Sequence, residues 1–355
     1  MVESVQNYPF RKEMPILNSL FTKNDSANFT RMKAVICHSF GGPENLQFGE
    51  LPDPSPNENQ VLISVKACGV NFPDVLIIQN KYQFKPELPF SPGGEVAGRI
   101  IGVGENVHHL KEGDEVLALC GWGGFAEKVA VDADRVFPLP SGLDPQVAAT
   151  TLYTYGTSYH ALKDRAVLKD GETLVVLGAA GGVGLAALEL GKVMGAKVIA
   201  AASTQEKLDL CKSKGADELI NYEKEDLKSR IKELTNGKGA DVVYDPVGGK
   251  YTEPALRAIG WKGRYLIVGF ANGEIPKIPM NLPLLKGCSI QGVFWGQFSK
   301  LEPKVSIENI QQLVKWIYQG KIQQHIHRAY DLEEAAEALI ALQERKMLGK
   351  GVVMI

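Results

Sequence analysis

Apolar and polar positions follow different patterns in the two halves of the chain. Between residue 32 and about residue 140, short runs rich in β-branched residues alternate with Gly and Pro, which predicts a β-rich, barrel-like domain. The expected strands cover residues 34–37, 60–67, 95–103, 115–118 and 125–131. Residues 51–57 contain three prolines and are expected to form a turn-rich connection.

After residue 145 apolar strand cores alternate with amphipathic helices, which predicts a parallel sheet covered by helices on both faces. A helix is expected over 145–163, followed by strands at 173–177, 197–202, 218–220, 240–244 and 263–268. The helices between them are expected at 183–194, 204–214, 226–235 and 251–258. Helices at 306–318 and 332–345 precede a closing strand at 351–355, and the pattern leaves open which domain that strand joins. The predicted fold class is α/β.

Composition narrows the possible classes of protein. A length of 355 residues suggests about two domains. The net charge of −2 gives no electrostatic drive toward nucleic acid or an anionic membrane, and the apolar runs are too short to span a bilayer. Five scattered cysteines without a CxxC pair fit a reducing compartment rather than a disulfide scaffold. We expect a cytoplasmic protein, with a mitochondrial location as the alternative if residues 1–31 are a transit peptide rather than an untargeted tail.

The segment after the 173–177 strand predicts a dinucleotide site. Glycines stand at positions 178, 181 and 184, and a helix follows directly. Glycines allow backbone N–H groups to approach a pyrophosphate, and the helix N-terminus favours its negative charge. Ala180 stands where the usual fingerprint has its second glycine. The residues expected to contact the cofactor here are Gly178, Gly181, Gly182, Val183 and Gly184.

The end of the next strand bears on which dinucleotide is bound. An acidic residue usually stands there in NAD-selective sites, but this strand ends at Ser203 without one. Lys207, one turn into the next helix, offers a positive charge for the 2′-phosphate of NADPH, although it also fits an ordinary solvated helix lysine. Glu206 has the opposite charge, but Ser203 and Glu206 have the spacing of a capping box, which gives Glu206 a structural role. We therefore expect NADPH.

Several motifs in this chain resemble one known family. The segments CGVNFPD from Cys68, PGGEVAG from Pro92, KEGD from Lys111 and AAGGVG from Ala179 are similar to those of the medium-chain dehydrogenase/reductase superfamily, in particular its zinc-free quinone oxidoreductase branch. The resemblance extends from Met32 to the C-terminus. It implies a GroES-like catalytic domain over 32–155, completed by 300–355, and a Rossmann NADP-binding domain over 156–299, after a tail over 1–31.

The resemblance also bears on the metal and the reaction. Zinc-dependent relatives hold their catalytic metal through thiolate and imidazole ligands. The matching positions here are Asn71, Gly94 and Tyr153, which supply neither, so no metal is expected. Oxidation of an alcohol is difficult without a Lewis acid. A quinone or an α,β-unsaturated carbonyl needs less help, because its oxygen is already conjugated, and reduction of such an acceptor is therefore expected.

Other roles are implied by the resemblance alone. Asn71 and Thr157 match positions beside the nicotinamide, although Asn71 also fits a turn residue and the Thr157 hydroxyl a bond to its own backbone. Tyr222 matches a tyrosine beside the 2′-phosphate. The backbone at Val247, Val268 and Phe270 follows strand ends and is expected to line the cofactor crevice.

The acceptor side is less determined by sequence. Tyr82 matches a tyrosine of the acceptor pocket, either as proton donor or as an aromatic wall. Phe294, Trp295 and Phe298 fit a pocket wall, an interface strand or plain core equally well. His160 is expected to be a helix-packing residue, and His325 with His327 a surface pair rather than a metal site.

The sequence thus predicts a two-domain, zinc-independent NADPH reductase that transfers hydride to a quinone or an α,β-unsaturated carbonyl. An enoyl-thioester reductase and a non-catalytic NADPH-binding protein are the alternatives. The expected partners are a small-molecule substrate and, by analogy with the superfamily, a second copy of the chain bound through residues 289–294. No nucleic-acid or membrane partner is expected.

Overall fold

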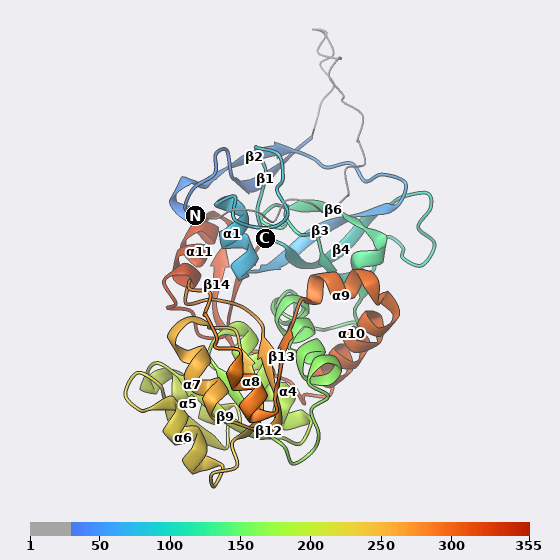
Figure 1. Cartoon of the computed structure of the whole chain (residues 1–355). Coiled ribbons are helices and arrows are strands. Elements are labelled where there is room, and N and C mark those ends of the chain that lie inside the picture. The colour runs from blue at the N-terminus through green and yellow to red at the C-terminus, as the bar shows by residue number, and fades with distance from the viewer. Residues whose placement is uncertain (1–29) are drawn as a thin grey trace.

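The computed structural model describes residues 30–355, and Figure 1 shows two sheet-based lobes. The chain passes from the first lobe to the second between residues 138 and 173 and returns between residues 292 and 326. The predicted tail over 1–31 therefore lies outside the described residues, except for its last two positions. Arg31 already begins strand β1 (Arg31–Ile36), which pairs antiparallel with β2 (Gln47–Pro52). The expected connection at 51–57 was wrong at its start, because Leu51 and Pro52 belong to β2. Pro52 is tolerated there because β2 pairs with β1 alone.

The first lobe contains a seven-stranded sheet in the order β14-β15-β3-β4-β5-β7, with β6 pairing with β3. Its strands are β3 (Gln60–Gly69), β4 (Glu95–Val103), β5 (Glu115–Leu119), β6 (Lys128–Asp132), β7 (Val136–Pro138), β14 (Ile326–Asp331) and β15 (Lys350–Met354). β15 pairs antiparallel with β3 and parallel with β14. The closing strand thus completes the sheet of the first lobe. Short helix α1 (Phe72–Ile78), which the sequence reasoning missed, follows β3 directly.

The second lobe is a six-stranded parallel sheet in the order β10-β9-β8-β11-β12-β13. Its strands are β8 (Thr173–Leu177), β9 (Lys197–Ala202), β10 (Glu218–Asn221), β11 (Ala240–Asp245), β12 (Ile259–Ile267) and β13 (Ser289–Gly292). This is the doubly wound order, in which ligands bind where the winding reverses, between β8 and β11. The predicted Rossmann-type sheet is confirmed.

Helices cover both faces of this sheet, as its apolar strands require. They are α4 (Gly182–Val193), α5 (Gln205–Ser213), α6 (Leu227–Leu234), α7 (Thr252–Arg257) and α8 (Asn281–Lys286). Along β8, Leu174 and Val176 join one buried cluster, whereas Val175 and Leu177 join another. Alternate side chains of the central strand therefore fill two separate cores, one on each face.

The single helix expected over 145–163 was wrong. The segment is divided into α2 (Pro145–Ala148), the π-helical turn η3 (Leu152–Gly156), α3 (Thr157–Tyr159) and a second π-helical turn η4 (His160–Arg165). The Glu95 carboxylate of β4 accepts the backbone N–H groups of Leu152 and Tyr153, so these groups do not continue the helix from α2. An acidic side chain from another part of the chain thus sets this break.

The C-terminal part returns to the first lobe through α9 (Trp295–Leu301), α10 (Pro303–Tyr318) and α11 (Ala335–Gln343). The remaining short turns are η1 (Pro43–Asn45), η2 (Ala133–Arg135), η5 (Gly249–Tyr251) and η6 (Leu332–Glu334). Within residues 30–355, no helix has the length and apolar character needed to cross a membrane.

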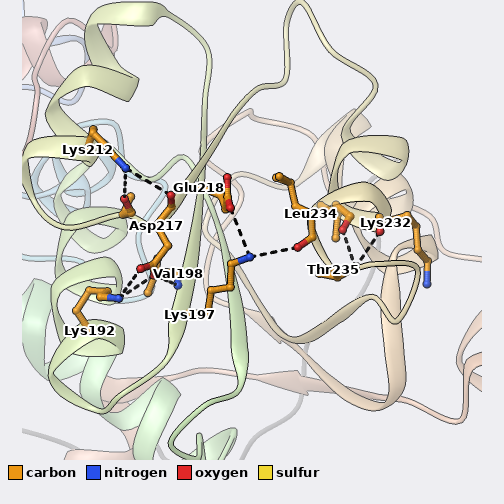
Figure 2. Close-up of polar contacts among 11 residues, drawn as sticks. Lys192, Lys197, Val198, Lys212, Asp217, Glu218, Lys232, Leu234 and Thr235 are labelled. Atoms are coloured by element: carbon orange, nitrogen blue, oxygen red, sulfur yellow. Dashed lines mark hydrogen bonds and ion pairs between the residues drawn. The ribbon is translucent and has the colours of Figure 1, made fainter.

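Charged side chains form hydrogen bonds and ion pairs at the amino ends of β9 and β10 in the six-stranded sheet (Figure 2). The Asp217 carboxylate accepts hydrogen bonds from Lys192 Nζ at 2.7 Å and from the Val198 N–H at 2.7 Å. Lys197 Nζ donates to the Leu234 carbonyl at 3.3 Å and lies 3.5 Å from Glu218. These contacts connect α4, β9, β10 and α6 at the amino ends of the strands, whereas the glycine turn follows the carboxyl end of β8. The charged side chains at the amino ends therefore stabilise the packing of these elements.

Candidate active site

In the glycine turn between β8 and α4, the backbone of the helix lies so close to the backbone of the turn that a side chain would not fit between them. A Cβ on Gly184 would lie 2.3 Å from the Gly178 carbonyl oxygen, so this helix packs against the strand only with glycine there. Gly178 has a φ of +58°, which favours glycine for a different reason. Gly181 is the N-cap of α4 and leaves the first N–H groups of the helix, at Gly182 and Val183, beside the turn. Such a helix start is suited to a pyrophosphate.

Ser203, Lys207 and Tyr222 come together at the carboxyl ends of β9 and β10. Lys207 Nζ donates to the Ser203 hydroxyl at 3.3 Å. The Tyr222 ring packs on Tyr251 with centroids 4.3 Å apart, and burial raises the pKa of Tyr222 to about 12, so its hydroxyl remains a neutral donor. The expected capping box was wrong, because Thr204 is the N-cap of α5 and accepts from the Lys207 N–H at 3.3 Å. Ser203 is thereby left beside Lys207 Nζ.

Arg345 is a further cation at this position that the sequence reasoning missed. Its backbone carbonyl accepts from Lys207 Nζ at 3.4 Å, and its guanidinium donates to the Ala271 carbonyl at 3.0 Å. Its positive charge lowers the pKa of Tyr222, although burial raises that pKa by more. Because 138 residues separate Lys207 from Arg345, no local pattern pointed to this pairing.

The turns after β11 and β12 border the glycine turn. Asp245 Oδ1 accepts the N–H groups of Val247 and Gly248, each at 2.8 Å, and the Val268 N–H donates to the Asp245 carbonyl at 2.9 Å. A Cβ on Gly178 would lie 2.7 Å from the Val247 side chain, which places that valine against the turn. Phe270 is 38% exposed. The structure therefore brings the expected crevice residues to adjacent strand ends.

Asn71 is buried at the N-cap of α1, and its side-chain amide is held by the protein on both sides. Its Oδ1 accepts from Lys350 Nζ at 2.6 Å. Its Nδ2 donates to the Gly69 carbonyl at 3.1 Å and to Glu95 Oε2 at 3.0 Å. Both amide hydrogens are thus used within the protein, and one lone pair on Oδ1 remains for a ligand.

Three buried charged residues surround this amide, and the sequence reasoning assigned a role to none of them. Lys350 Nζ also donates to the Val70 carbonyl at 2.7 Å, and Asp74 Oδ2 accepts from the Asn71 N–H at 2.8 Å. Burial raises the pKa of Glu95 and lowers that of Lys350, while it raises the pKa of Asp74 to about 7. One buried lysine therefore lies close to two buried carboxyl groups. When Asp74 is protonated, the positive charge of Lys350 is matched by the single negative charge of Glu95.

Lys350 connects this network to the glycine turn. A Cβ on Gly182 would lie 3.1 Å from Lys350 Cδ and 3.1 Å from Thr154 Cγ2, and the Gly349 N–H donates to the Ala180 carbonyl at 2.8 Å. Thr157 follows on the same helical segment and is partly buried. The hydroxyls of Thr150, Thr151 and Thr154 donate to carbonyls four residues earlier, but within residues 30–355 the Thr157 hydroxyl has no such bond.

Aromatic side chains lie next to Gly94, the residue that precedes Glu95. A Cβ on Gly94 would lie 3.0 Å from the Tyr153 hydroxyl, and the Tyr153 ring meets Trp295 edge to face with centroids 6.2 Å apart. Tyr82 lies on the loop between α1 and β4, with its ring 5.8 Å from Phe84. Lys300 Nζ of α9 lies 4.9 Å from the Phe84 centroid. This aromatic group therefore combines residues that are far apart in the sequence.

The remaining aromatic and histidine candidates differ in how far they are buried. Trp295 and Phe298 are buried, whereas Phe294 is 54% exposed. His160 stacks on Phe298 with centroids 3.8 Å apart and is bonded to Asp164 at 3.0 Å, so it packs the helix. His325 is partly buried and His327 exposed.

Asn71, Gly94 and Tyr153, the positions that match zinc ligands in relatives, lie around Glu95 in one place. An amide, a bare backbone and a phenol do not form the thiolate and imidazole set that catalytic zinc requires. Among residues 30–355, no group of three or more His, Cys, Asp or Glu side chains is placed to hold a metal ion. The residues present therefore do not fit a zinc site.

Comparison with known proteins agrees with this architecture. Residues 57–141 match the family described as alcohol dehydrogenase GroES-like domain, and residues 182–317 match the one described as zinc-binding dehydrogenase. The chain is 40% identical over 324 residues to a quinone oxidoreductase-like protein 2 homolog of Nematostella vectensis, covering 90% of this chain and 88% of the relative. It is 36% identical to quinone oxidoreductase-like protein 2 of Bos taurus, covering 90% of this chain and 91% of that protein.

Among solved structures, the fold superimposes on an Escherichia coli quinone oxidoreductase complexed with NADPH, with a TM-score of 0.85 and 30% identity over 92% of this chain and all of that one. A mycobacterial protein complexed with NADPH gives a TM-score of 0.85 and 29% identity, covering 91% of this chain and 100% of that one. The chain belongs to the medium-chain dehydrogenase/reductase superfamily. Within that superfamily its place is in the quinone oxidoreductase-like branch, whose members are NAD(P)-dependent oxidoreductases.

Proposed function

We propose that this protein is a zinc-independent NADPH-dependent reductase that transfers hydride to a quinone or an α,β-unsaturated carbonyl. The observation that carries the proposal is the junction at Gly182, where the glycine turn meets Lys350 and, through it, Asn71. At that junction the glycine turn, which we propose binds the pyrophosphate, lies beside a polar site without metal ligands. Such a site suits an acceptor that is already activated by conjugation.

The choice of NADPH rests on the cluster of Ser203, Lys207, Tyr222 and Arg345. No acid stands at the end of β9, so a 2′-phosphate meets no carboxylate there. Lys207 and Arg345 supply positive charge, and the hydroxyls of Ser203 and Tyr222 supply neutral hydrogen-bond donors. The two relatives whose structures contain NADPH support the same choice.

Bound NADPH would supply the hydride, and the residues of this chain position the reactants and exclude water. The turn at Gly178, Gly181 and Gly184 and the start of α4 would hold the pyrophosphate. Backbone groups at Val247, Val268 and Phe270 would line the crevice toward the nicotinamide. Thr157 offers the nicotinamide a hydroxyl that has no hydrogen-bond partner within residues 30–355, and Asn71 offers a fixed carbonyl oxygen.

The acceptor would lie on the aromatic side, against Tyr82 and Trp295. On this division of labour, residues 156–299 bind the cofactor, whereas residues 32–155 with 300–355 form the acceptor side. Tyr82 is proposed here as part of the pocket wall, because its ring packs on Phe84 within a loop.

The decisive experiment is the consumption of NADPH by the full-length protein with a panel of quinones, enones and enoyl thioesters. Turnover with a quinone or a simple enone is the expected result. Turnover confined to enoyl thioesters would instead identify an enoyl-thioester reductase. Tight NADPH binding without turnover on any of the three classes would identify a non-catalytic binding protein and refute the proposal.

A further inference from the structure

We propose that the Tyr153 hydroxyl donates the hydrogen bond that holds the acceptor's carbonyl oxygen while this oxygen gains negative charge. The inference rests on the proposed function and assigns one of its site residues. Tyr153 would thereby act at the position where a metal-dependent relative would use its metal.

The position of Tyr153 is fixed from both ends of the residue. Its backbone N–H donates to Glu95 Oε1 at 3.3 Å, and the other oxygen of the same carboxylate accepts from Asn71 Nδ2. Its ring packs edge to face on the buried Trp295. It also lies in the π-helical turn η3, a conformation that occurs frequently at functional sites. Glu95 therefore fixes Tyr153 and Asn71 relative to each other.

The Tyr153 hydroxyl is also available, whereas both Asn71 amide hydrogens and two of the three Lys350 N–H groups already have protein acceptors. The acceptors of Lys350 Nζ are the Val70 carbonyl and Asn71 Oδ1. The Tyr153 side chain is only partly buried, and within residues 30–355 its hydroxyl has no hydrogen-bond partner. It lies against Gly94, where any larger residue would crowd it.

Two other hydroxyls near the junction have no partner within residues 30–355, and their positions suit other tasks. Thr157 lies four residues after Tyr153 and so on the same side of the helical segment, where we assign it to the nicotinamide. Tyr82 lies on a loop, whereas Tyr153 lies on a helical turn anchored by Glu95. Precise placement of a donor favours the anchored residue.

The chemistry requires a donor that keeps its proton. Burial, with the nearby Tyr82 and Asp74, raises the pKa of Tyr153 well above its ordinary value, so the phenol stays neutral. Bound NADPH would supply the hydride: its nicotinamide C4–H bond would break, leaving NADP⁺, and a C–H bond would form at the acceptor carbon conjugated to the carbonyl, with the displaced π electrons moving to the oxygen. Tyr153 stabilises this oxygen by its hydrogen bond, and water later supplies the proton that gives the reduced product. Removal of one such donor typically lowers kcat about 10²–10³-fold.

The test compares the full-length wild type with Tyr153→Phe, which keeps the ring and removes only the hydroxyl. We expect kcat to fall about 10²-fold or more with an enone, with a smaller loss for a quinone, whose reduced oxygen is less basic. The dissociation constant of NADPH should not change. Tyr159→Phe is the matched control, because Tyr159 lies on the same helical segment but packs on Trp316, and it should keep wild-type activity.

A second measurement does not depend on turnover. With NADP⁺ present, p-nitrophenolate carries an oxygen charge like the one formed in the reaction, and its binding is followed by absorbance. We expect binding to Tyr153→Phe to be roughly 10-fold weaker than to the wild type, as for loss of a hydrogen bond to a charged group.

Equal kcat and equal p-nitrophenolate affinity in the wild type and Tyr153→Phe would overturn this inference and leave the proposed function intact. The same holds if Tyr82→Phe loses both properties while Tyr153→Phe keeps them, since Tyr82 would then be the donor. A wild type that binds NADPH but reduces no acceptor would overturn the proposed function and this inference with it.

Discussion

Lys207 is the residue on which discrimination between the two pyridine nucleotides should depend most. Its ammonium already reaches Ser203 at 3.3 Å, so a 2′-phosphate bound there would meet a preformed donor pair. Lys207→Ala should weaken NADPH binding about 10- to 100-fold, the usual cost of a lost hydrogen bond to a charged group, and leave NADH binding unchanged. Fluorescence titration with both nucleotides measures this. Lys212→Ala on the same helix is the control, and equal losses for NADPH and NADH in Lys207→Ala would contradict the assignment.

Asp74 gives a prediction about pH. Its pKa in the folded protein is about 7, against 3.8 as the ordinary value, mainly because of burial. Between these values the folded state holds a proton that the unfolded state has lost, so this group makes the free energy of unfolding fall as pH rises from about 4 to about 7. Denaturant unfolding of the wild type and Asp74→Asn across this range measures the difference. The variant should lack this part of the slope, and parallel curves would show that Asp74 is ionised throughout.

At the scale of single elements, the glycines of the β8–α4 turn have two different roles: Gly184 is needed for close packing, whereas Gly181 is proposed to be needed for cofactor binding. A Cβ on Gly184 would lie 2.3 Å from a backbone oxygen, whereas a Cβ on Gly181 would lie 3.4 Å from the same atom, which is ordinary contact. Gly184→Ala should therefore lower both Tm and NADPH affinity. Gly181→Ala should keep Tm near the wild-type value and weaken NADPH binding alone, because a methyl group there adds bulk beside the first N–H groups of α4, which we propose bind the pyrophosphate. Thermal unfolding and titration of both variants decide this, and matching behaviour of the two would refute the division.

Elements with a strong local pattern were predicted well, and elements set by distant contacts were not. The 173–177 and 197–202 strands agree with β8 and β9 at both ends because continuous apolar runs bounded by polar residues define them. The break after α2 could not be foreseen, since it depends on Glu95 of β4 accepting the N–H groups at 152 and 153.

The same reason explains what was missed in the candidate site. The glycine turn is contiguous and was found from sequence. Lys350 and Arg345 lie near the C-terminus and reach residues 279 and 138 positions away, respectively, so no spacing rule pointed to them. Asn71 was identified by resemblance, but the contacts that fix its side-chain amide and occupy both amide hydrogens become visible only when Gly69, Glu95 and Lys350 are placed around it.

At the scale of the whole molecule, the C-terminal segment links the two lobes. β15 completes the sheet of the first lobe, while Gly349 donates to Ala180 in the glycine turn of the second. Lys350, the next residue, carries the connection on to Asn71. A change in the position of the glycine turn would thus act directly on the buried network of Asn71, Glu95 and Lys350.

Within residues 30–355, one apolar surface of the second lobe is left uncovered. β13 is the edge strand of the six-stranded sheet and, among the described residues, pairs with β12 alone. Beside it, Met280 is 79% exposed, Leu284 78% and Trp261 73%, and Trp261 packs against Gly287 at the end of α8. An exposed sheet edge flanked by large apolar side chains is suited to pairing with an identical edge across a twofold axis.

We therefore expect a homodimer formed through β13 and α8. The double change Leu284→Lys and Leu285→Lys places two charges on the proposed apolar interface, where burying them without partners is costly, so it should yield a monomer. Light scattering after size-exclusion chromatography measures the mass directly. Tyr318→Lys, at the exposed end of α10, is the control and should leave the dimer unchanged. A wild type that is monomeric at micromolar concentration would refute the dimer, and a dimeric double variant would place the interface elsewhere, because neither result is compatible with an interface centred on α8.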